Sequence, residues 1–281
     1  MTAIALSPEP ATRPRRSHMF WTLNDVIVLT RRSLARIARE PESLMDVTVM
    51  PLIFVLLFSY VFGGAIHIPG GGNYHEYLIG GMLGMGMANT APGTAVGLVS
   101  DMSTGLIDRF KSLPMSRAAV LAGRTIADVL TQVIGLVVVV AAGLAIGWRV
   151  HSGPGDVAAA LGLALLMGYA FTWMGACLGM FLRSPEAAQA TGFVFFLPLT
   201  FISSAFVPTQ GMPGWLQAFA NWNPLSALAA ACRHLFGNPN PAALVHAWPM
   251  QHPELAVLAW SAAIIAVFAP LSVRLYRRKA V

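Results

Sequence analysis

The segment over residues 101–117 combines apolar and charged side chains at a spacing that suits binding to another protein. A short helix beginning at Gly105 would present three apolar and three charged residues: Leu106, Ile107 and Phe110, with Asp108, Arg109 and Lys111 around them. The apolar side chains of such a helix can enter the groove of a soluble partner while its charges set the register. We predict a docking helix over 105–111, ended by Pro114. The alternative is a helix that only lies along a membrane surface.

ATP hydrolysis would require a motif that this sequence lacks. A P-loop has the pattern G-x-x-x-x-G-K-[ST], in which the lysine neutralises phosphate. Lys111 is the only lysine followed by serine or threonine, and Phe110 stands where the motif requires its second glycine. We therefore predict that the chain is not an ATPase and holds no cofactor, so that it either works passively or uses an ATP-binding partner.

The other residues capable of chemistry are scattered. His67, His75 and Glu76 could hold a metal ion on the outer side, but histidines in loops are more often solvated, and we predict no metal site. Cys177 and Cys232 lack metal-ligand spacing. The acidic residues fall at the ends of apolar stretches, which leaves a proton-coupled carrier without intramembrane carboxylates. No G-x-S-x-G or H-E-x-x-H motif is present, and we predict no catalytic residue.

These residues must be positioned by elements that lie in a membrane. Of the 281 residues, 56% are hydrophobic and only 11% are charged, whereas a soluble domain has about 25% charged residues. This composition excludes a water-soluble enzyme. Cutting the chain at its charged residues leaves six uncharged stretches: 47–75, 77–100, 129–148, 157–182, 187–232 and 255–273. Because a membrane-crossing helix needs about 20 residues, we predict an all-α integral membrane protein with six transmembrane helices.

The positions of the basic residues predict the orientation of these helices. With six crossings, 16 of the 18 lysines and arginines lie on the side of both termini, and only Arg149 and Arg233 lie on the other. Lysine and arginine mark the cytoplasmic side. We therefore expect both termini and the 101–128 loop in the cytoplasm, and the protein in the plasma membrane. The net charge of +6 follows from this topology and not from binding to nucleic acid.

Three regions follow from this pattern. Residues 1–46 comprise a tail rich in Pro, Ser and Arg and, over 23–39, an amphipathic helix whose arginines would face lipid headgroups along the cytoplasmic leaflet. Residues 47–273 form the six-span domain, and residues 274–281 a basic cytoplasmic tail. Within the second span Asn89 and Pro92 predict either a kink or a polar contact that faces protein instead of lipid. Gly175-x-x-x-Gly179 predicts close packing of the fourth span.

Two sets of residues resemble a known family. The first is Gly105, Asp108-Arg109, Leu113-Pro114, Ser116-Arg117, Gly123-Arg124 and Asp128, and the second is Met212-Pro213, Asn223-Pro224-Leu225 and Arg233. Their order and spacing resemble the permeases of ABC-2 type transporters, including the daunorubicin-resistance group that exports drugs and lipids. Ala227 departs from the pattern, because an aromatic or polar residue is more usual there. The resemblance covers nearly the whole chain.

The resemblance implies partners and roles. Such permeases pair with a separate ATP-binding subunit, which would hold ATP and Mg²⁺, and with a second permease that is either a copy or a paralogue. They export hydrophobic or amphipathic substrates. The 105–111 helix would be the coupling helix, and the stretch 208–252 would hold short external or re-entrant helices that cap the pathway, with cap residues Pro208, Pro213, Trp215, Pro224 and Arg233.

The substrate path is the least defined part of this interpretation. Asn89 and the phenylalanines of the fifth span, Phe193, Phe196 and Phe201, either pack or line a path for an apolar substrate. Drug, lipid, siderophore and polysaccharide carriers share these features. An integral-membrane enzyme or scaffold that needs no ATPase is the alternative from another class.

Overall fold

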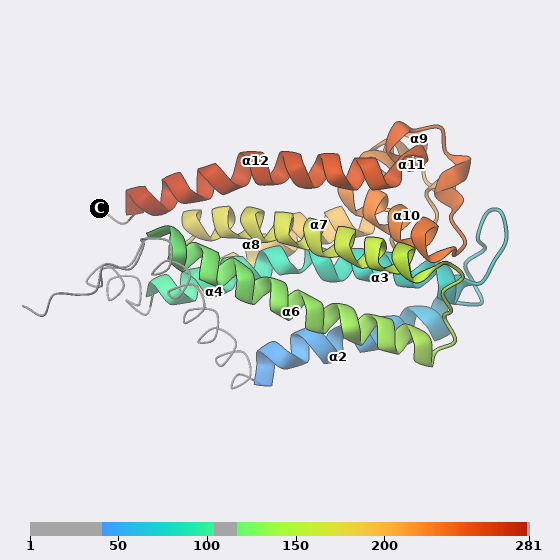
Figure 1. The fold of residues 1–281 in the computed structure, drawn as a ribbon, viewed down its shortest axis with the longest axis horizontal. Coiled ribbons are helices and arrows are strands. Elements are labelled where there is room, and N and C mark those ends of the chain that lie inside the picture. The colour runs from blue at the N-terminus through green and yellow to red at the C-terminus, as the bar shows by residue number, and fades with distance from the viewer. Residues whose placement is uncertain (1–40, 104–116, 280–281) are drawn as a thin grey trace, which may run out of the picture.

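The computed structural model describes residues 41–103 and 117–279, and every regular element in these two ranges is a helix. The long helices run side by side along the longest axis of the molecule, and the short helices α9, α10 and α11 gather at one end (Figure 1). The predicted all-α fold is confirmed. The 23–39 helix and the 105–111 coupling helix both lie outside the described residues.

The long helices form the body of the bundle. They are α2 (Pro41–Leu57), α3 (Tyr74–Ala88), α4 (Thr90–Ser103), α6 (Arg117–Ala145), α7 (Pro154–Phe181), α8 (Pro185–Phe201) and α12 (Pro253–Lys279). A π-helical turn, η1 (Phe58–Phe62), continues α2. The second span is divided at Asn89, where α3 ends and α4 begins, at the place where the sequence predicts a kink.

Short elements close one end of the bundle. They are the 3₁₀ turns η2 (Thr209–Gly211) and η3 (Pro241–Leu244) and the helices α9 (Gly214–Trp222), α10 (Pro224–Phe236) and α11 (Trp248–Gln251). We call this end the outer end, after the orientation that the basic residues predict. The end of α4, the start of α6 and the end of α12 lie at the opposite end of the bundle (Figure 1).

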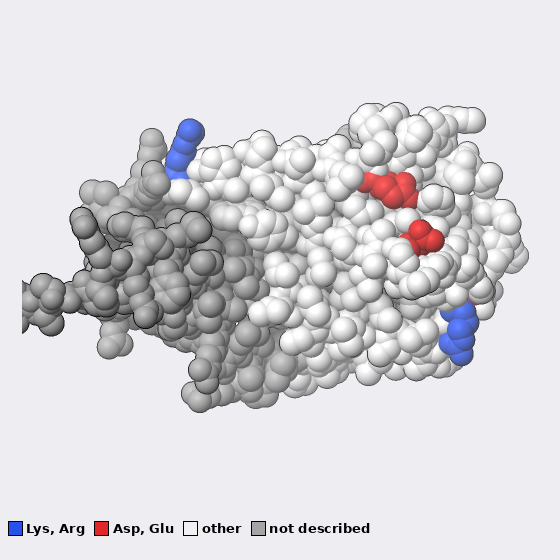
Figure 2. Space-filling view, in the orientation of Figure 1, with Lys and Arg blue, Asp and Glu red and all other residues white. Residues whose placement is uncertain are grey.

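The apolar surface and helix lengths are those of a membrane protein. Ala127–Ala145 of α6, all of α7 and Pro253–Leu275 of α12 are long and apolar enough to cross a bilayer. The other long helices are shorter or interrupted, so the count of six crossings stays a prediction. On the face shown in Figure 2, charged atoms lie towards the two ends and the surface between them is uncharged.

Helix boundaries follow local sequence rules. Ser184 and Asn223 each precede a proline and cap the next helix, because their side-chain oxygens accept from the backbone N–H of Ala187 and Leu225. Gly237 ends α10 with φ of 68°, a left-handed conformation that glycine adopts without strain.

Glycines let α4 and α7 approach closely, as the sequence predicts. A Cβ atom on Gly175 would lie 2.1 Å from the carbonyl oxygen of Ala91, and one on Gly179 would lie 3.0 Å from that of Ala95. Either would be tighter than ordinary van der Waals contact, so only glycine fits this crossing without movement.

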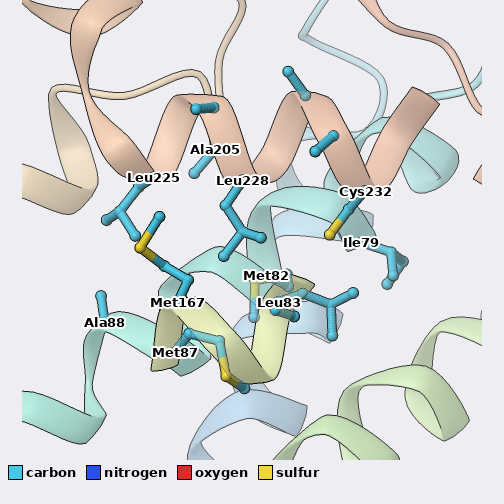
Figure 3. Packing of buried hydrophobic residues seen from close by; sticks show 14 of the residues in the cluster. Ile79, Met82, Leu83, Met87, Ala88, Met167, Ala205, Leu225, Leu228 and Cys232 are labelled. Atoms are coloured by element: carbon cyan, nitrogen blue, oxygen red, sulfur yellow. The ribbon is translucent and has the colours of Figure 1, made fainter. Parts of the chain in front are cut away.

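The largest core lies among α3, α7 and α10. Leu225, Leu228 and Cys232 of α10 face Met82 and Leu83 of α3, and Met167 of α7 completes the cluster (Figure 3). We expected residues 208–252 to lie externally as short helices. They are short, but α10 is buried from Pro224 to Arg233 instead of lying on a surface. Its run of alanine and leucine explains the difference, because small apolar side chains fit between neighbouring helices.

Candidate functional site

The outer end is built around a stretch of unwound chain. α8 ends at Phe201, three residues after Pro198, and residues 202–206 follow without helical structure. Residues 203–206 are nevertheless buried. A buried carbonyl that has lost its helical partner must find another donor, and at membrane depth such backbone is tolerated only when protein groups supply those donors.

Asn223 supplies two of these donors. Its side-chain Nδ2 donates to the carbonyl oxygens of Leu199 at 2.7 Å and Ile202 at 2.6 Å. Its Oδ1 accepts from the N–H of Leu225 at 2.8 Å, which caps α10. One amide therefore ties the end of α8 to the start of α10, and this gives a physical role to the Asn-Pro pair that the sequence singled out.

Arg233 supplies two more to the unwound stretch and a third hydrogen bond to α3. Its Nη2 donates to the carbonyl oxygens of Ser204 at 2.9 Å and Ala205 at 3.0 Å, and its Nε donates to that of Tyr77 at 2.8 Å. The guanidinium carbon lies 3.5 Å from the centroid of the Tyr77 ring. The residue is only 1% exposed. Its positive charge is met by carbonyl dipoles and by the face of an aromatic ring.

Two tyrosines and a serine complete this arrangement. The Tyr77 hydroxyl donates to the Ser204 carbonyl at 2.5 Å, and the Tyr74 hydroxyl donates to that of Phe206 at 3.1 Å. The Ser226 hydroxyl accepts from the N–H of Ser204 at 2.8 Å. We refer to Tyr74, Tyr77, Ser204, Ala205, Ser226 and Arg233 as the Arg233 cluster. It joins α3, α10 and the unwound stretch into one unit.

Aromatic contacts extend this unit to η1. The rings of Phe58 and Phe206 stack with centroids 4.4 Å apart, and the Phe201 ring lies 5.7 Å from that of Phe206. Ser59 of η1 and His75 of α3 form a side-chain hydrogen bond nearby. The outer ends of α2, α3 and α8 are thus held together.

The remaining predicted cap residues have separate positions. Pro208 is buried next to η2, Pro213 precedes α9, and Pro224 is the first residue of α10. Trp215 is exposed on α9, with Phe219 and Trp222 at helical spacing on the same side. Only Arg233 among the predicted cap residues belongs to the Arg233 cluster.

The residues predicted for a substrate path are not brought together as one set. Asn89 is exposed at the break between α3 and α4. Phe193 and Phe201 are 59% and 53% exposed on α8. Phe196 is 6% exposed, and its ring packs edge-on against Phe171 of α7 with centroids 5.9 Å apart. Phe196 therefore contributes to packing between helices of the same chain.

Two contacts between a histidine and a glutamate join different elements at the outer end: the 146–153 loop to α3, and α10 to α12. His151 Nε2 lies 2.9 Å from Glu76 Oε1, and His234 Nδ1 lies 2.6 Å from Glu254 Oε1. His75 and Glu76, which the sequence offered as weak metal ligands, thus have partners on different elements. No group of three or more metal-ligating residues occurs within the described ranges.

Sequence reasoning named Arg233 and Asn223 but missed the groups that hold them. Tyr74 and Tyr77 contact partners that are far away in sequence, and no local spacing links them to Arg233. Ser226 lies seven residues before Arg233 on the same face of α10, but its partner Ser204 is 22 residues away. A usable signal was the Ser203-Ser204 pair close after Pro198, because it marks polar backbone within an apolar stretch.

Comparison with known proteins agrees with this architecture. The profile of the ABC-2 type transporter family matches residues 24–236. The chain is 35% identical to a daunorubicin resistance ABC transporter permease protein, DrrB1, of Streptomyces coeruleorubidus, over 88% of this chain and 84% of the relative. It is 26% identical to a probable doxorubicin resistance ABC transporter permease protein, DrrC, of Mycobacterium tuberculosis, over 90% and 88%.

A third relative extends the likeness. The chain is 26% identical to the putative transport permease ycf38 of Porphyra purpurea, over 77% of this chain and 75% of the relative. The family profile covers more than half of the chain and includes both sequence patterns described above. The chain therefore belongs to the ABC-2 type transporter family.

Proposed function

We propose that this chain is the membrane subunit of an ATP-driven exporter that moves hydrophobic or amphipathic molecules, such as drugs or lipids, out across the plasma membrane. The observation that carries the proposal is the match to a daunorubicin resistance permease over most of both chains. The described surface between the charged ends of the face shown in Figure 2 is uncharged and supports the proposal, because such a surface suits a protein surrounded by lipid.

ATP and Mg²⁺ would be held by a separate P-loop subunit. Because the chain lacks a P-loop motif, ATP-driven export would need such a partner, and Gly105 to Lys111 would dock on it. This segment joins α4 to α6, so a force on it would reach both helices directly. A second permease, either a copy or a paralogue, would complete the transporter. Both termini would be cytoplasmic.

The substrate would pass beside the α3–α4 break. Asn89 offers an exposed amide there, and Phe193 and Phe201 offer exposed rings on α8. An amide and aromatic rings suit a molecule that has both polar and apolar parts. The short helix α9 would lie in the outer membrane interface, where Trp215 and Trp222 are favourable.

Co-purification with the P-loop ATPase, followed by substrate-stimulated ATP hydrolysis in vesicles with daunorubicin as the probe, tests the function. Phe110→Ala should weaken assembly by about 2 kcal/mol if Phe110 is an anchor. Arg109→Glu should disturb coupling even where the complex forms, and Arg15→Ala is the control in the tail. If Phe110→Ala and Arg109→Glu assemble and export like wild type, the coupling assignment is wrong.

Two further results would favour the alternatives. A chain that captures no ATPase would favour an integral-membrane enzyme or scaffold, and export of a siderophore or polysaccharide without daunorubicin would redirect the substrate class.

Cysteines placed at Ser112 and Ala280 should resist labelling from outside intact cells, and external labelling of either would refute the proposed orientation.

A further inference from the structure

A charge-assisted hydrogen bond joins α4 and α6, the two helices on either side of the 104–116 segment. The Thr94 hydroxyl donates to Asp128 Oδ2 at 2.8 Å. Thr94 lies nine residues before the end of α4, and Asp128 lies eleven residues after the start of α6. At 1.5 Å per residue the bond is about 14 Å and about 17 Å along these helices from the segment.

One helical turn further into the bundle, polar groups on the same faces reach α7. Gln132, four residues after Asp128, donates from Nε2 to the Thr172 hydroxyl at 3.0 Å. Thr90, four residues before Thr94, lies with its hydroxyl 3.3 Å from the carbonyl oxygen of Gly168. The Thr172 hydroxyl donates to that same carbonyl at 3.0 Å. Together with the Thr94–Asp128 bond, these hydrogen bonds link α4, α6 and α7 through polar side chains. We call this set of residues the polar seam: Thr90, Thr94, Asp128, Gln132 and Thr172.

The part of the seam between Gln132 and Thr172 is enclosed by protein, whereas Thr90 and Asp128 are half-buried. Thr94, Gln132 and Thr172 are buried, and a Cβ on Gly168 would lie 2.6 Å from Gln132 Oε1 and 2.7 Å from the Met87 sulfur. Gln132 Oε1 itself has no hydrogen-bond partner in the part of the chain that the structure describes. In such a low-dielectric site, the bonds that do form are stronger than in water, and separating them is correspondingly costly.

The seam also adjoins the break in the second span. Thr90 is the first residue of α4, directly after Asn89, and its hydroxyl lies 2.7 Å from the carbonyl oxygen of Met87 near the end of α3. A displacement of α4 relative to α3 would therefore be felt at Asn89 first, because the backbone turns there.

We propose that Thr94, Asp128, Gln132 and Thr172 are positioning residues for energy coupling. They make α4 and α6 move as one body with α7 when the 104–116 segment is displaced, and they deliver that displacement to the α3–α4 break. This inference rests on the proposed function. Without the seam, α4 and α6 would respond separately, and ATP would be hydrolysed without proportionate transport.

Transport per ATP separates this role from a purely structural one. The full chain with its co-purified ATPase is reconstituted in vesicles, and daunorubicin export and ATP hydrolysis are measured together. Thr94→Val keeps the shape but removes the hydroxyl, and should lower daunorubicin exported per ATP at least about five-fold. Thr94→Ser should restore the ratio to within about two-fold of wild type, because it restores the hydroxyl.

Thr131→Val is the matched control. Thr131 is near Asp128 on α6, but its hydroxyl donates within its own helix to the Ala127 carbonyl at 3.1 Å. This variant should export like wild type. Asp128→Asn is a second test of the same bond, since the amide keeps an acceptor oxygen for Thr94 but loses the charge, and should lower the ratio less than Thr94→Val.

Each outcome is informative. If wild type shows no daunorubicin-dependent ATP hydrolysis, the proposed function fails. If wild type is active and Thr94→Val keeps the wild-type ratio, the coupling role of the seam is overturned while the function stands. If Thr94→Val and Asp128→Asn both lose folded protein, the seam serves folding alone, and the inference is equally overturned.

Discussion

Replacing Arg233 with lysine should destabilise the outer end even though the charge is kept. The guanidinium donates to three carbonyl oxygens, and a lysine ammonium at this position cannot reach all three, because it is a point charge on a flexible chain. We take two hydrogen bonds to be lost. A hydrogen bond to a charged donor contributes about 1.5 kcal/mol at the lower end of the usual range, so the free energy of unfolding should fall by about 3 kcal/mol. The Ser204 carbonyl would still accept a hydrogen bond from the Tyr77 hydroxyl, so the Ala205 carbonyl would be the group most affected by the lost hydrogen bonds.

Arg233→Met should be no worse than Arg233→Lys. Methionine loses every hydrogen bond, but it also removes a buried charge, and removing a buried charge recovers its desolvation cost. The expected order of stability is therefore wild type, then Met, then Lys, with Met and Lys close together. A ranking by chemical similarity would place Lys next to wild type.

The protein contains its own reporter for this experiment. Cys177 and Cys232 are both buried, so a thiol-reactive fluorophore labels them only as the bundle opens on heating. At about 2–4 °C per kcal/mol for a chain of this size, Arg233→Lys should lower the midpoint by about 6–12 °C. Arg149→Lys is the matched control: it changes an arginine at the same end whose bonds are to neighbouring carbonyls, and should shift little. A wild-type midpoint for Arg233→Lys would refute the reasoning.

Other perturbations test separate parts of the structure. Gly175→Ala should destabilise by about 1–3 kcal/mol, since its Cβ would meet the Ala91 carbonyl at 2.1 Å, whereas Gly162→Ala on the same helix meets nothing within 4 Å and should be neutral or stabilising in the same thermal assay. In a variant that keeps Trp215 as its one tryptophan, with the other six replaced by phenylalanine, lipid-borne quenchers placed at interfacial depth should quench the fluorescence more than quenchers at the bilayer centre; the reverse would place α9 deep in the membrane. Glu186 accepts from its own amide and from the Ser184 hydroxyl, which lower the pKa of its carboxyl. A lowered folded-state pKa stabilises the start of α8 above the unfolded pKa of about 4.3 and loses this effect as pH falls through the folded value. The protection of the amides of residues 187–190 from hydrogen exchange, taken relative to the intrinsic exchange rate at each pH, should therefore fall on acidification in wild type but not in Glu186→Gln.

Local rules account for much of the fold that the sequence predicts. Apolar runs predict helices, prolines at 185 and 224 begin helices, and Asn89 divides one. The spacing of Gly175 and Gly179 predicts the close crossing with α4. These features depend on neighbours within a few residues, or on the absence of a side chain, so they are readable without a structure.

The Arg233 cluster was not readable in this way. The six-span topology placed Arg233 on the outer side, and a charge that interrupts an apolar run is ordinarily a sign of exposure. Burial became favourable because residue 233 meets Tyr77, 156 positions earlier, and the carbonyls of Ser204 and Ala205. Hydropathy cannot register donors and acceptors that only the folded chain brings together.

The positions of the two polar groupings suggest how motion could be divided within one chain. The Arg233 cluster fixes α3 to α10 at the outer end, whereas the seam fixes α4 to α6 and α7 nearer the opposite end. α3 and α4 belong to the same predicted span and meet at Asn89, where the helix turns. If the outer half is anchored and the inner half follows the 104–116 segment, the relative movement must be absorbed where the two halves join. The break at Asn89 is the place in that span where bending disrupts the fewest helical hydrogen bonds, and it is also where an exposed amide is available to a substrate.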